Sequence, residues 1–298
     1  MDWNTNVVST MVPGTRTPIA DDLRASGGNT ITLAFATGEC GSENFGGVPG
    51  AAMAASNVPL FETAGIDFIV STGGAAGSFT CGSDAGFETF LGRWQSAHLV
   101  GIDLDIEAGQ SAQQIADLVA RIAAAHTTHP SLRFSLTIAT LANTDGATSL
   151  NVHGTDTLQA MRDRFGDTWP DYVTVDLMTM DYGGPSPGVC VVVDGACQMG
   201  QSAVQAAHNL HATFGVPYAA IELTPMIGGN DVQGERFTLA DVDTVMAFAI
   251  AQGLAGVHWW SYDRDVDCDQ TFASPTCNSI GGVGPRGYLT RFLAAAGR

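Results

Sequence analysis

The sequence contains no lysine, so its twelve basic residues are all arginine. Thirty acidic residues outnumber them and give a formal net charge of −18. A surface this negative repels nucleic-acid phosphates and anionic membranes. We therefore expect neither nucleic acid nor a membrane as a partner. A neutral or cationic substrate fits this charge better.

Long apolar runs are also missing. No stretch approaches the roughly 20 apolar residues that span a bilayer, although hydrophobic residues make up 45% of the chain and can build a sizeable core. The start, Asp2-Trp3-Asn4, shows no charged-then-apolar export signal. We expect that any such signal was removed or was never part of this sequence.

Cysteine is scarce, and no C-x-x-C motif is present. The six cysteines occupy positions 40, 81, 190, 197, 268 and 277. An even count favours disulfides and an oxidising, extracellular compartment. Cys190 and Cys197 flank one short loop and Cys268 and Cys277 another, which predicts two local disulfides and leaves Cys40–Cys81 as the third. Zinc binding is the less favoured alternative.

Short apolar runs alternate with helix-like stretches along the whole chain. The predicted strands are Thr30–Phe35, Asp67–Ser71, Val100–Glu107, Arg133–Ala139, Tyr172–Met180, Tyr218–Thr224 and Gly256–Ser261, with a weak eighth around Met1–Val12. The predicted helices are Ser111–His126, Ser202–Phe214, Leu239–Gln252 and Tyr288–Ala296. The glycine-rich segment 73–77 lacks the full G-x-G-x-x-G pattern and indicates a tight turn between strand and helix, not a phosphate loop.

This alternation predicts an α/β fold with a parallel sheet. Seven or eight such units in 298 residues indicate one (β/α)8 barrel, a TIM barrel, that fills residues 1–298 as a single domain. A doubly wound open sheet is the alternative. We expect no large inserted subdomain, because one strand and one helix account for the stretch between Tyr218 and Gly256.

The segment LVGIDLDIE, residues 99–107, carries the clearest chemical signal. Alternate side chains of a strand share a face, so Asp103, Asp105 and Glu107 lie on one side and aliphatic residues on the other. Clustered like charges raise the pKa of at least one carboxyl, which is what a general acid needs. Barrel active sites form where strands end, and Glu107 is the last of the three.

Two other interpretations of this strand stay open. Hard cations bind clustered carboxylates, but no second ligand cluster stands out, so we predict no metal. An exposed edge strand with solvated acids is less favoured, because the opposite face is fully aliphatic.

At these residues the sequence resembles the family 18 glycoside hydrolases, the chitinases and their relatives. Asp103-x-Asp105-x-Glu107 resembles the D-x-D-x-E core of the family, and Ser71-Thr72-Gly73-Gly74 its S-x-G-G strand. Met178 to Tyr182, M-T-M-D-Y, is similar to the family's M-x-Y-D strand end, and Trp260 to the tryptophan of its last strand. Residues 222–228 look like the seventh-strand segment of a bacterial chitinase subgroup. The motifs occur in the family's order over nearly the whole chain.

Two positions depart from the family pattern. Val100 stands where the motif usually begins with another aspartate, deep in the strand and away from the chemistry. Met180 replaces the usual tyrosine of M-x-Y-D, which normally contacts the acetamido group of the substrate. This substitution puts the role of Tyr182 in doubt, and Tyr182 is one candidate to replace that contact.

The resemblance implies retaining hydrolysis of β-1,4-linked N-acetylglucosamine by a substrate-assisted route. Glu107 would be the general acid and base, Asp105 would stabilise the oxazolinium intermediate, and Asp103 would tune Asp105. The residues implied in substrate binding are Trp260, Asp181, Tyr182, Met178, Gly73 and Gly74. The implied protein is a secreted, monomeric, endo-type chitinase that binds chitin or chitooligosaccharides and needs no cofactor.

Several alternatives remain at the level of single residues and of function. Trp260 could be a core residue, and Asp181 and Tyr182 could be turn residues before Gly183. Glu222 is a secondary candidate for the cleft, and His258 is better explained as a hydrogen-bonded core residue. The competing functions are an endo-β-N-acetylglucosaminidase acting on N-glycans and a non-catalytic chitin-binding lectin.

The lysine-free, acidic composition indicates either adaptation to high salt, since ions screen the self-repulsion of a charged surface, or high-GC coding bias in an acidic secreted enzyme. The first interpretation makes a testable prediction. We expect activity and thermal stability to rise from low to multimolar NaCl. A salt series of enzyme assays and melting curves checks this prediction. Best behaviour at low salt would contradict it.

Overall fold

The computed structural model describes residues 7–9 and 16–298 of the chain. Within them the chain divides into two compact units. Unit 1 comprises residues 7–9, 16–138 and 152–174, and unit 2 comprises residues 139–151 and 175–298. Each unit is described by itself.

Four parallel strands form the centre of unit 1. They are β3 (Thr30–Ala36), β7 (Asp67–Gly73), β9 (Leu99–Ile106) and β10 (Arg133–Ala139). β7 pairs with β3 on one side and β9 on the other, and β9 also pairs with β10. Most residues of β7, β9 and β10 are buried, including polar ones such as Ser71, Asp103 and Ser135.

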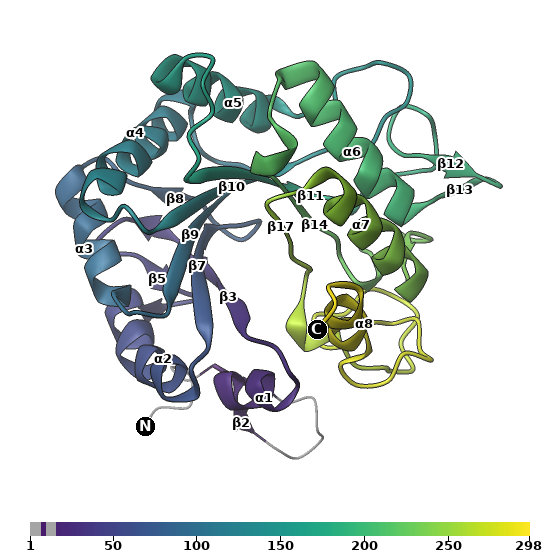
Figure 1. Ribbon diagram of the computed structural model, residues 1–298, viewed down its shortest axis with the longest axis horizontal. Helices are drawn as coiled ribbons and strands as arrows, with labels where there is room; N and C mark the ends of the chain where they lie inside the picture. Colours follow the sequence, from purple (N-terminus) through teal and green to yellow (C-terminus); the bar gives the residue numbers. More distant parts are fainter. Residues whose placement is uncertain (1–6, 10–15) are drawn as a thin grey trace. The chain divides into compact units, whose positions relative to one another are not determined.

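Five helices belong to unit 1: α1 (Ile19–Ala25), α2 (Gly50–Ala64), α3 (Asp84–Trp94), α4 (Ala112–Thr128) and α5 (Val152–Phe165). Figure 1 shows α2, α3 and α4 along the outer side of the strands. Aromatic side chains fill the space between: Phe68 on β7 packs against Phe61 of α2 and Trp94 of α3.

The sequence predicted only α4 among these five helices. Its apolar stripe is regular, and buried Ile115, Leu118 and Ile122 recur at helical spacing. α2 has no such stripe: it begins at Gly50, contains Pro59 and is rich in alanine, so its helical state depends on packing.

Short strands connect the main elements of unit 1. They are β1 (Val8–Ser9), β2 (Thr17–Pro18), β4 (Gly38–Glu39), β5 (Asn44–Phe45), β6 (Val48–Pro49) and β8 (Phe79–Thr80). β4 pairs with β8, and the predicted Cys40–Cys81 disulfide links the residues that follow them, with 5.0 Å between Cα atoms.

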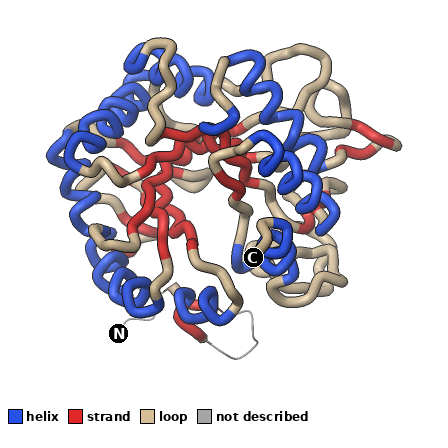
Figure 2. The backbone as a smooth tube through the Cα atoms, viewed as in Figure 1, coloured by secondary structure: helices blue, strands red, loops and turns tan. Residues whose placement is uncertain are grey.

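Unit 2 continues the alternation. Its parallel strands are β11 (Val173–Met178, whose first two residues belong to unit 1), β14 (Ile221–Thr224) and β17 (Gly256–Val257). Its helices are α6 (Met199–Phe214), α7 (Leu239–Gln252) and α8 (Gly287–Ala295). Figure 2 shows the helices alongside the strands. α7 has the predicted bounds, and α6 begins three residues earlier than predicted.

Two predicted strands of unit 2 are shorter than expected. Residues Tyr218–Ala220 form a 3₁₀ turn, η1, because the N–H of Ala220 donates to the carbonyl of Pro217. The last strand was predicted to run to Ser261, but β17 ends at Val257. Beyond it the pairing is irregular, with one isolated bridge between Trp260 and Met226.

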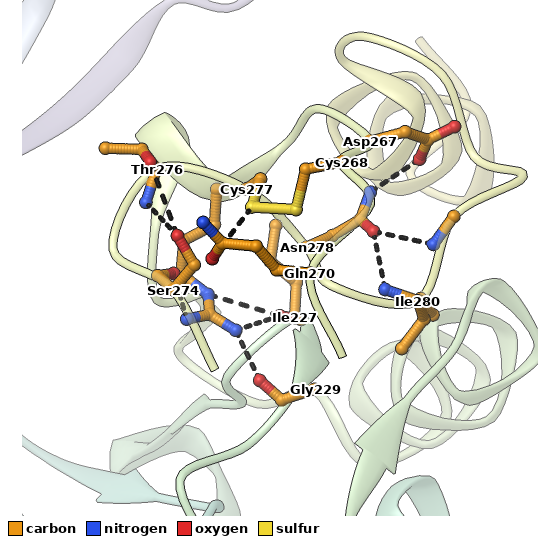
Figure 3. The surroundings of a disulfide bond; sticks show 12 residues. Ile227, Gly229, Asp267, Cys268, Gln270, Ser274, Thr276, Cys277, Asn278 and Ile280 are labelled. Atoms are coloured by element: carbon orange, nitrogen blue, oxygen red, sulfur yellow. Dashed lines mark hydrogen bonds between the residues drawn. A yellow bond between two sulfur atoms is a disulfide. The ribbon is translucent and has the colours of Figure 1, made fainter. Parts of the chain in front are cut away.

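The remaining elements of unit 2 are the hairpins β12 (Val192–Val193) with β13 (Ala196–Cys197) and β15 (Gly228–Gly229) with β16 (Arg236–Phe237), and the turn η2 (Tyr262–Arg264). Both predicted local disulfides are present, Cys190–Cys197 and Cys268–Cys277. Figure 3 shows that the second lies beside hydrogen bonds of Asp267 and Asn278, which order the loop.

The hydrogen-bonded strand order is β10-β9-β7-β3 in unit 1 and β17-β14-β11 in unit 2, and each follows the sequence order without a reversal. A doubly wound sheet reverses direction at a switch point, so that alternative is wrong. The parallel α/β fold is confirmed. Closure by an eighth strand stays a prediction, because Val8–Ser9 pairs antiparallel with β2 and residues 1–6 and 10–12 lie outside the described residues. Among the described residues, no helix is long and apolar enough to cross a membrane.

Replacing Ser111 by alanine tests how α4 begins. The Ser111 hydroxyl accepts the N–H of Gln114, and the Gln114 side chain accepts the N–H of Ser111. Losing this capping box should lower the free energy of unfolding by about 1 kcal/mol. Urea unfolding measures the change. A variant as stable as wild type would show that the cap contributes nothing.

Candidate active site

The two aspartates of β9 are buried within unit 1. Asp103 is 7% exposed and Asp105 4% exposed, and Ile102, Leu104 and Ile106 on the other face are also buried. β9 lies between β7 and β10. The alternation of faces is confirmed, and an exposed edge strand is excluded.

Hydroxyl groups of the neighbouring strands surround Asp103. Ser71 on β7 donates to one carboxylate oxygen at 2.5 Å. Ser135 and Thr137 on β10 donate to the other, each at 2.7 Å. The register explains this contact, because both serines lie directly beside Asp103 in the sheet. Three donors around one carboxylate stabilise its negative charge away from water.

Glu107 follows the last residue of β9 and is only partly buried. Its carboxyl accepts the N–H of Ala75 and forms a hydrogen bond with the side chain of Asp105. Such a bond between two carboxyl groups requires a proton on one of them. Burial raises the pKa of Glu107, while these two hydrogen bonds oppose the shift. The end of β9 therefore brings the carboxyl groups of Asp105 and Glu107 together.

Two glycines, Gly73 at the end of β7 and Gly74 directly after it, permit the close approach of this strand to β9. Gly73 has φ of 88°, and a Cβ built on it would lie 2.1 Å from the carbonyl oxygen of Asp105. A Cβ on Gly74 would lie 3.0 Å from the ring of Phe35. The turn predicted for residues 73–77 is present, with the N–H of Gly77 donating to Gly74. It leads to β8 before the helix begins.

In unit 2, Asp181 and Tyr182 form the turn after β11, which agrees with the turn alternative raised from the sequence. Asp181 has a positive φ of 52° and its carboxylate accepts the N–H of Val232 at 3.0 Å. Burial raises its pKa. Tyr182 is 3% exposed, and Met178 is half-buried at the end of β11. The substrate-binding roles of these three residues stay predictions.

The two tryptophans of the last strand segment differ in their surroundings. Trp259 stacks on Phe292 of α8, with ring centroids 4.6 Å apart, so it is a packing residue. Trp260 is 38% exposed, which excludes a fully buried core position. Its backbone N–H donates to Pro225, and its carbonyl accepts from Ile227.

Glu222 and His258 lie next to each other. Glu222 is fully buried, and a ring nitrogen of His258 lies 3.6 Å from its carboxylate. The His258 side chain is 29% exposed, so it is not a fully buried core residue as predicted. The role of Glu222 as a cleft residue stays a prediction.

Sequence reasoning missed several polar residues of both units. Ser71, Ser135 and Thr137 contact Asp103 only through strand register, which a single sequence does not show. Asn230 and Glu235 are both 4% exposed and contact the turn after β11. A buried acid within an otherwise polar loop gives no periodic signal. Among the described residues, no cluster of His, Cys, Asp or Glu is arranged to hold a metal ion.

Two curated relatives match part of the chain. A "Probable bifunctional chitinase/lysozyme" of Escherichia coli (strain K12) is 37% identical over 103 residues, which is 31% of this chain and 11% of that protein. "Endochitinase 11" of Metarhizium anisopliae is 33% identical over 110 residues, 31% of this chain and 19% of that protein. The matches therefore span a small part of the length of these relatives. No protein-family model matches the chain.

Solved structures match over nearly the full length. The catalytic domain of a hyperthermophilic chitinase from Pyrococcus furiosus has a TM-score of 0.74 at 20% identity, covering 98% of this chain and 97% of that one. Another match is to catalytic-site mutants of active domain 2 of the thermostable chitinase from the same organism, complexed with chito-oligosaccharides. The TM-score is 0.75 at 20% identity, covering 99% of this chain and 97% of that one. A chitinase from Chromobacterium violaceum gives 0.54 at 13% identity, covering 94% of each chain.

This chain resembles chitinase catalytic domains. The family resemblance drawn from the motifs is thereby confirmed, and the fold is that of the Pyrococcus chitinase domain. The residues that carry the chemistry in this chain are the subject of proposals below.

Replacing Gly73 by alanine tests the close approach of β7 to β9. The methyl group would collide with the Asp105 carbonyl, and φ is positive, so we expect a loss of about 2 kcal/mol in the free energy of unfolding. The control is Gly92→Ala in α3, where a Cβ meets nothing within 4 Å and alanine should stabilise the helix by up to about 1 kcal/mol. Urea unfolding compares the two. Equal stability of both variants would contradict the prediction.

Proposed function

We propose that this protein is a glycoside hydrolase that cleaves β-1,4 linkages between N-acetylglucosamine units of chitin, with retention of configuration. The supporting observation is the contact between the carboxyl groups of Asp105 and Glu107 at the end of a buried strand, next to Asp103 with its three hydroxyl donors. The similarity to chitinase domains supports the same activity.

Glu107 is the proposed general acid and base. Burial raises its pKa, so the carboxyl keeps its proton to higher pH than an ordinary glutamate and can donate it to the leaving glycosidic oxygen. The same carboxylate then takes a proton from the water that completes hydrolysis. Its position just beyond β9 suits this role, because active sites of β/α barrels form at the carboxyl ends of strands.

The substrate itself supplies the nucleophile in this proposal. The carbonyl oxygen of the acetamido group attacks the anomeric carbon and forms a positively charged oxazolinium ring. Asp105 holds the acetamido N–H and stabilises this charge. Asp103, held by Ser71, Ser135 and Thr137, lies two residues earlier on the same face and is proposed to share a proton with Asp105 and so tune its charge.

The proposed substrate contacts follow the family resemblance. Trp260, with an exposed ring face, is the proposed floor for a pyranose ring, since aromatic faces pack against sugar C–H groups. Asp181 is proposed to bind the acetamido group. Tyr182 and Met178, which are near it in sequence, are proposed to contact the substrate as well. Gly73 and Gly74 are proposed to line the site.

We further propose a secreted, monomeric protein with endo-type action. The three disulfides fit an oxidising compartment. Among the described residues, β14 and α7 are separated only by the short β15–β16 hairpin, which fits a shallow, open cleft and cleavage within a polymer.

Product analysis on N-acetylglucosamine oligomers of defined length tests this function. Wild type should release shorter oligomers, and Glu107→Gln should be slower by a factor on the order of a hundred or more, because it loses the general acid. Glu62→Gln, which alters an exposed carboxyl on α2, is the control and should match wild type. All three are assayed at low and at multimolar NaCl.

The outcomes separate the candidate functions. Near-wild-type turnover by Glu107→Gln would exclude Glu107 as the acid. No cleavage of oligomers by wild type, with cleavage of a high-mannose glycoprotein, would favour an endo-β-N-acetylglucosaminidase. Binding without turnover of either substrate would favour a chitin-binding lectin.

A further inference from the structure

The loop between β15 and β16 holds the turn that carries Asp181. Three consecutive backbone N–H groups of this turn donate to side chains of the loop. The N–H of Asp181 donates to Asn230 at 3.3 Å, and those of Tyr182 and Gly183 donate to the two carboxyl oxygens of Glu235, each at 3.0 Å. The N–H of Val232 donates back to the Asp181 carboxylate at 3.0 Å.

The loop is ordered by its own hydrogen bonds. The N–H of Asn230 donates to the carbonyl of Glu235. The N–H of Glu235 donates to the carbonyl of Val232. The side-chain amide of Asn230 donates to Met226 at 2.9 Å. Asn230 and Glu235 are each 4% exposed. These two buried side chains therefore form a preformed support for the turn.

The turn needs such a support. Asp181 has a left-handed backbone, which costs a non-glycine residue on the order of 1 kcal/mol and persists only when neighbours hold it. The contacts from Asn230 and Glu235 meet the backbone on either side of the Asp181 Cα. They fix where its carboxyl lies.

Charge couples the two acids of this cluster. Burial, with a smaller contribution from the charge of Asp181, raises the pKa of Glu235 to about 7 although the two N–H donors lower it. The other groups that act on Asp181 are Asp231, which raises its pKa, and Arg264, which lowers it. The buried Tyr182 hydroxyl also interacts with Glu235 and has a pKa well above its ordinary value, so it stays neutral.

We propose that Glu235 is a positioning residue, which holds the Asp181 carboxyl in place for the acetamido group of a bound N-acetylglucosamine unit. This inference rests on the proposed function. Only an ionised carboxyl has two oxygens that both accept N–H groups well, whereas a protonated one has a single good acceptor. The support of the turn is complete when Glu235 is ionised, although ionisation of a buried group disfavours folding. Substrate binding should therefore weaken as pH falls through about 7.

Glu235→Gln tests the proposal, because an amide copies the protonated acid in shape and in its single acceptor. Above pH 7 we expect the KM of the variant to be roughly tenfold higher than the KM of wild type. This is the effect expected when one hydrogen bond to a charged group is lost. We expect its KM to be independent of pH, while wild-type KM rises as the medium becomes acidic. The kcat values of the two proteins should stay within about twofold, because Glu107 and Asp105 are unchanged.

Asp267→Asn is the matched control. Asp267 also accepts two consecutive backbone N–H groups, of Val283 and Gly284, at 3.1 and 2.9 Å, but it holds a loop beside the Cys268–Cys277 disulfide (Figure 3). This variant loses the same kind of contact and should keep the wild-type dependence of KM on pH.

The measurement is a set of Michaelis curves for the three proteins on N-acetylglucosamine oligomers, from about pH 5 to about pH 9. A Glu235→Gln variant with the wild-type KM profile, or one in which kcat alone falls, would overturn the positioning role and leave the proposed function intact. The same KM change in Asp267→Asn would also overturn it, as a general effect of instability. No cleavage by wild type would overturn the proposed function and this inference with it.

Discussion

Buried negative charge is the constraint on which both units of this structure depend. β9 brings two aspartates into the interior and ends at a glutamate, and a carboxylate without donors in that environment would cost several kcal/mol. The neighbouring strands provide these donors. Ser71, Ser135 and Thr137 surround Asp103, and the glycine at position 73 lets the backbone of β7 come close enough for the Ala75 N–H to reach Glu107.

The scarcity of cations makes these neutral donors necessary. With twelve arginines for thirty acids, most carboxylates have no positive partner available. Arg93 does pair with the buried Glu43, but Asp265 in unit 2 instead accepts the N–H groups of Tyr288 and Leu289 at the start of α8. Glu235 accepts two backbone N–H groups in the same way. Backbone and hydroxyl donors lower the pKa of an acid, but burial has the larger effect and leaves the pKa values of Asp265 and Glu235 raised.

The predictions from sequence succeeded where a pattern was local and periodic. The alternating acids of β9, the amphipathic α4 and the exact bounds of α7 follow from side-chain periodicity. The three disulfide pairs follow from spacing and from elimination of the last pair. Prediction failed for α2 and for the end of the last strand, because alanine-rich helices and irregular pairing depend on what packs against them.

The sequence by itself determined the order of the main strands, the acids of one strand face and the cysteines that pair, because each depends on residues close together in the chain or on residue type alone. Only the tertiary structure decided which donors satisfy those acids. Ser71 and Ser135 are each 32 residues from Asp103, and Glu235 is 53 residues from Tyr182. Strand register and loop packing bring such residues together, and these depend on the free energy of the whole fold, which no short motif encodes.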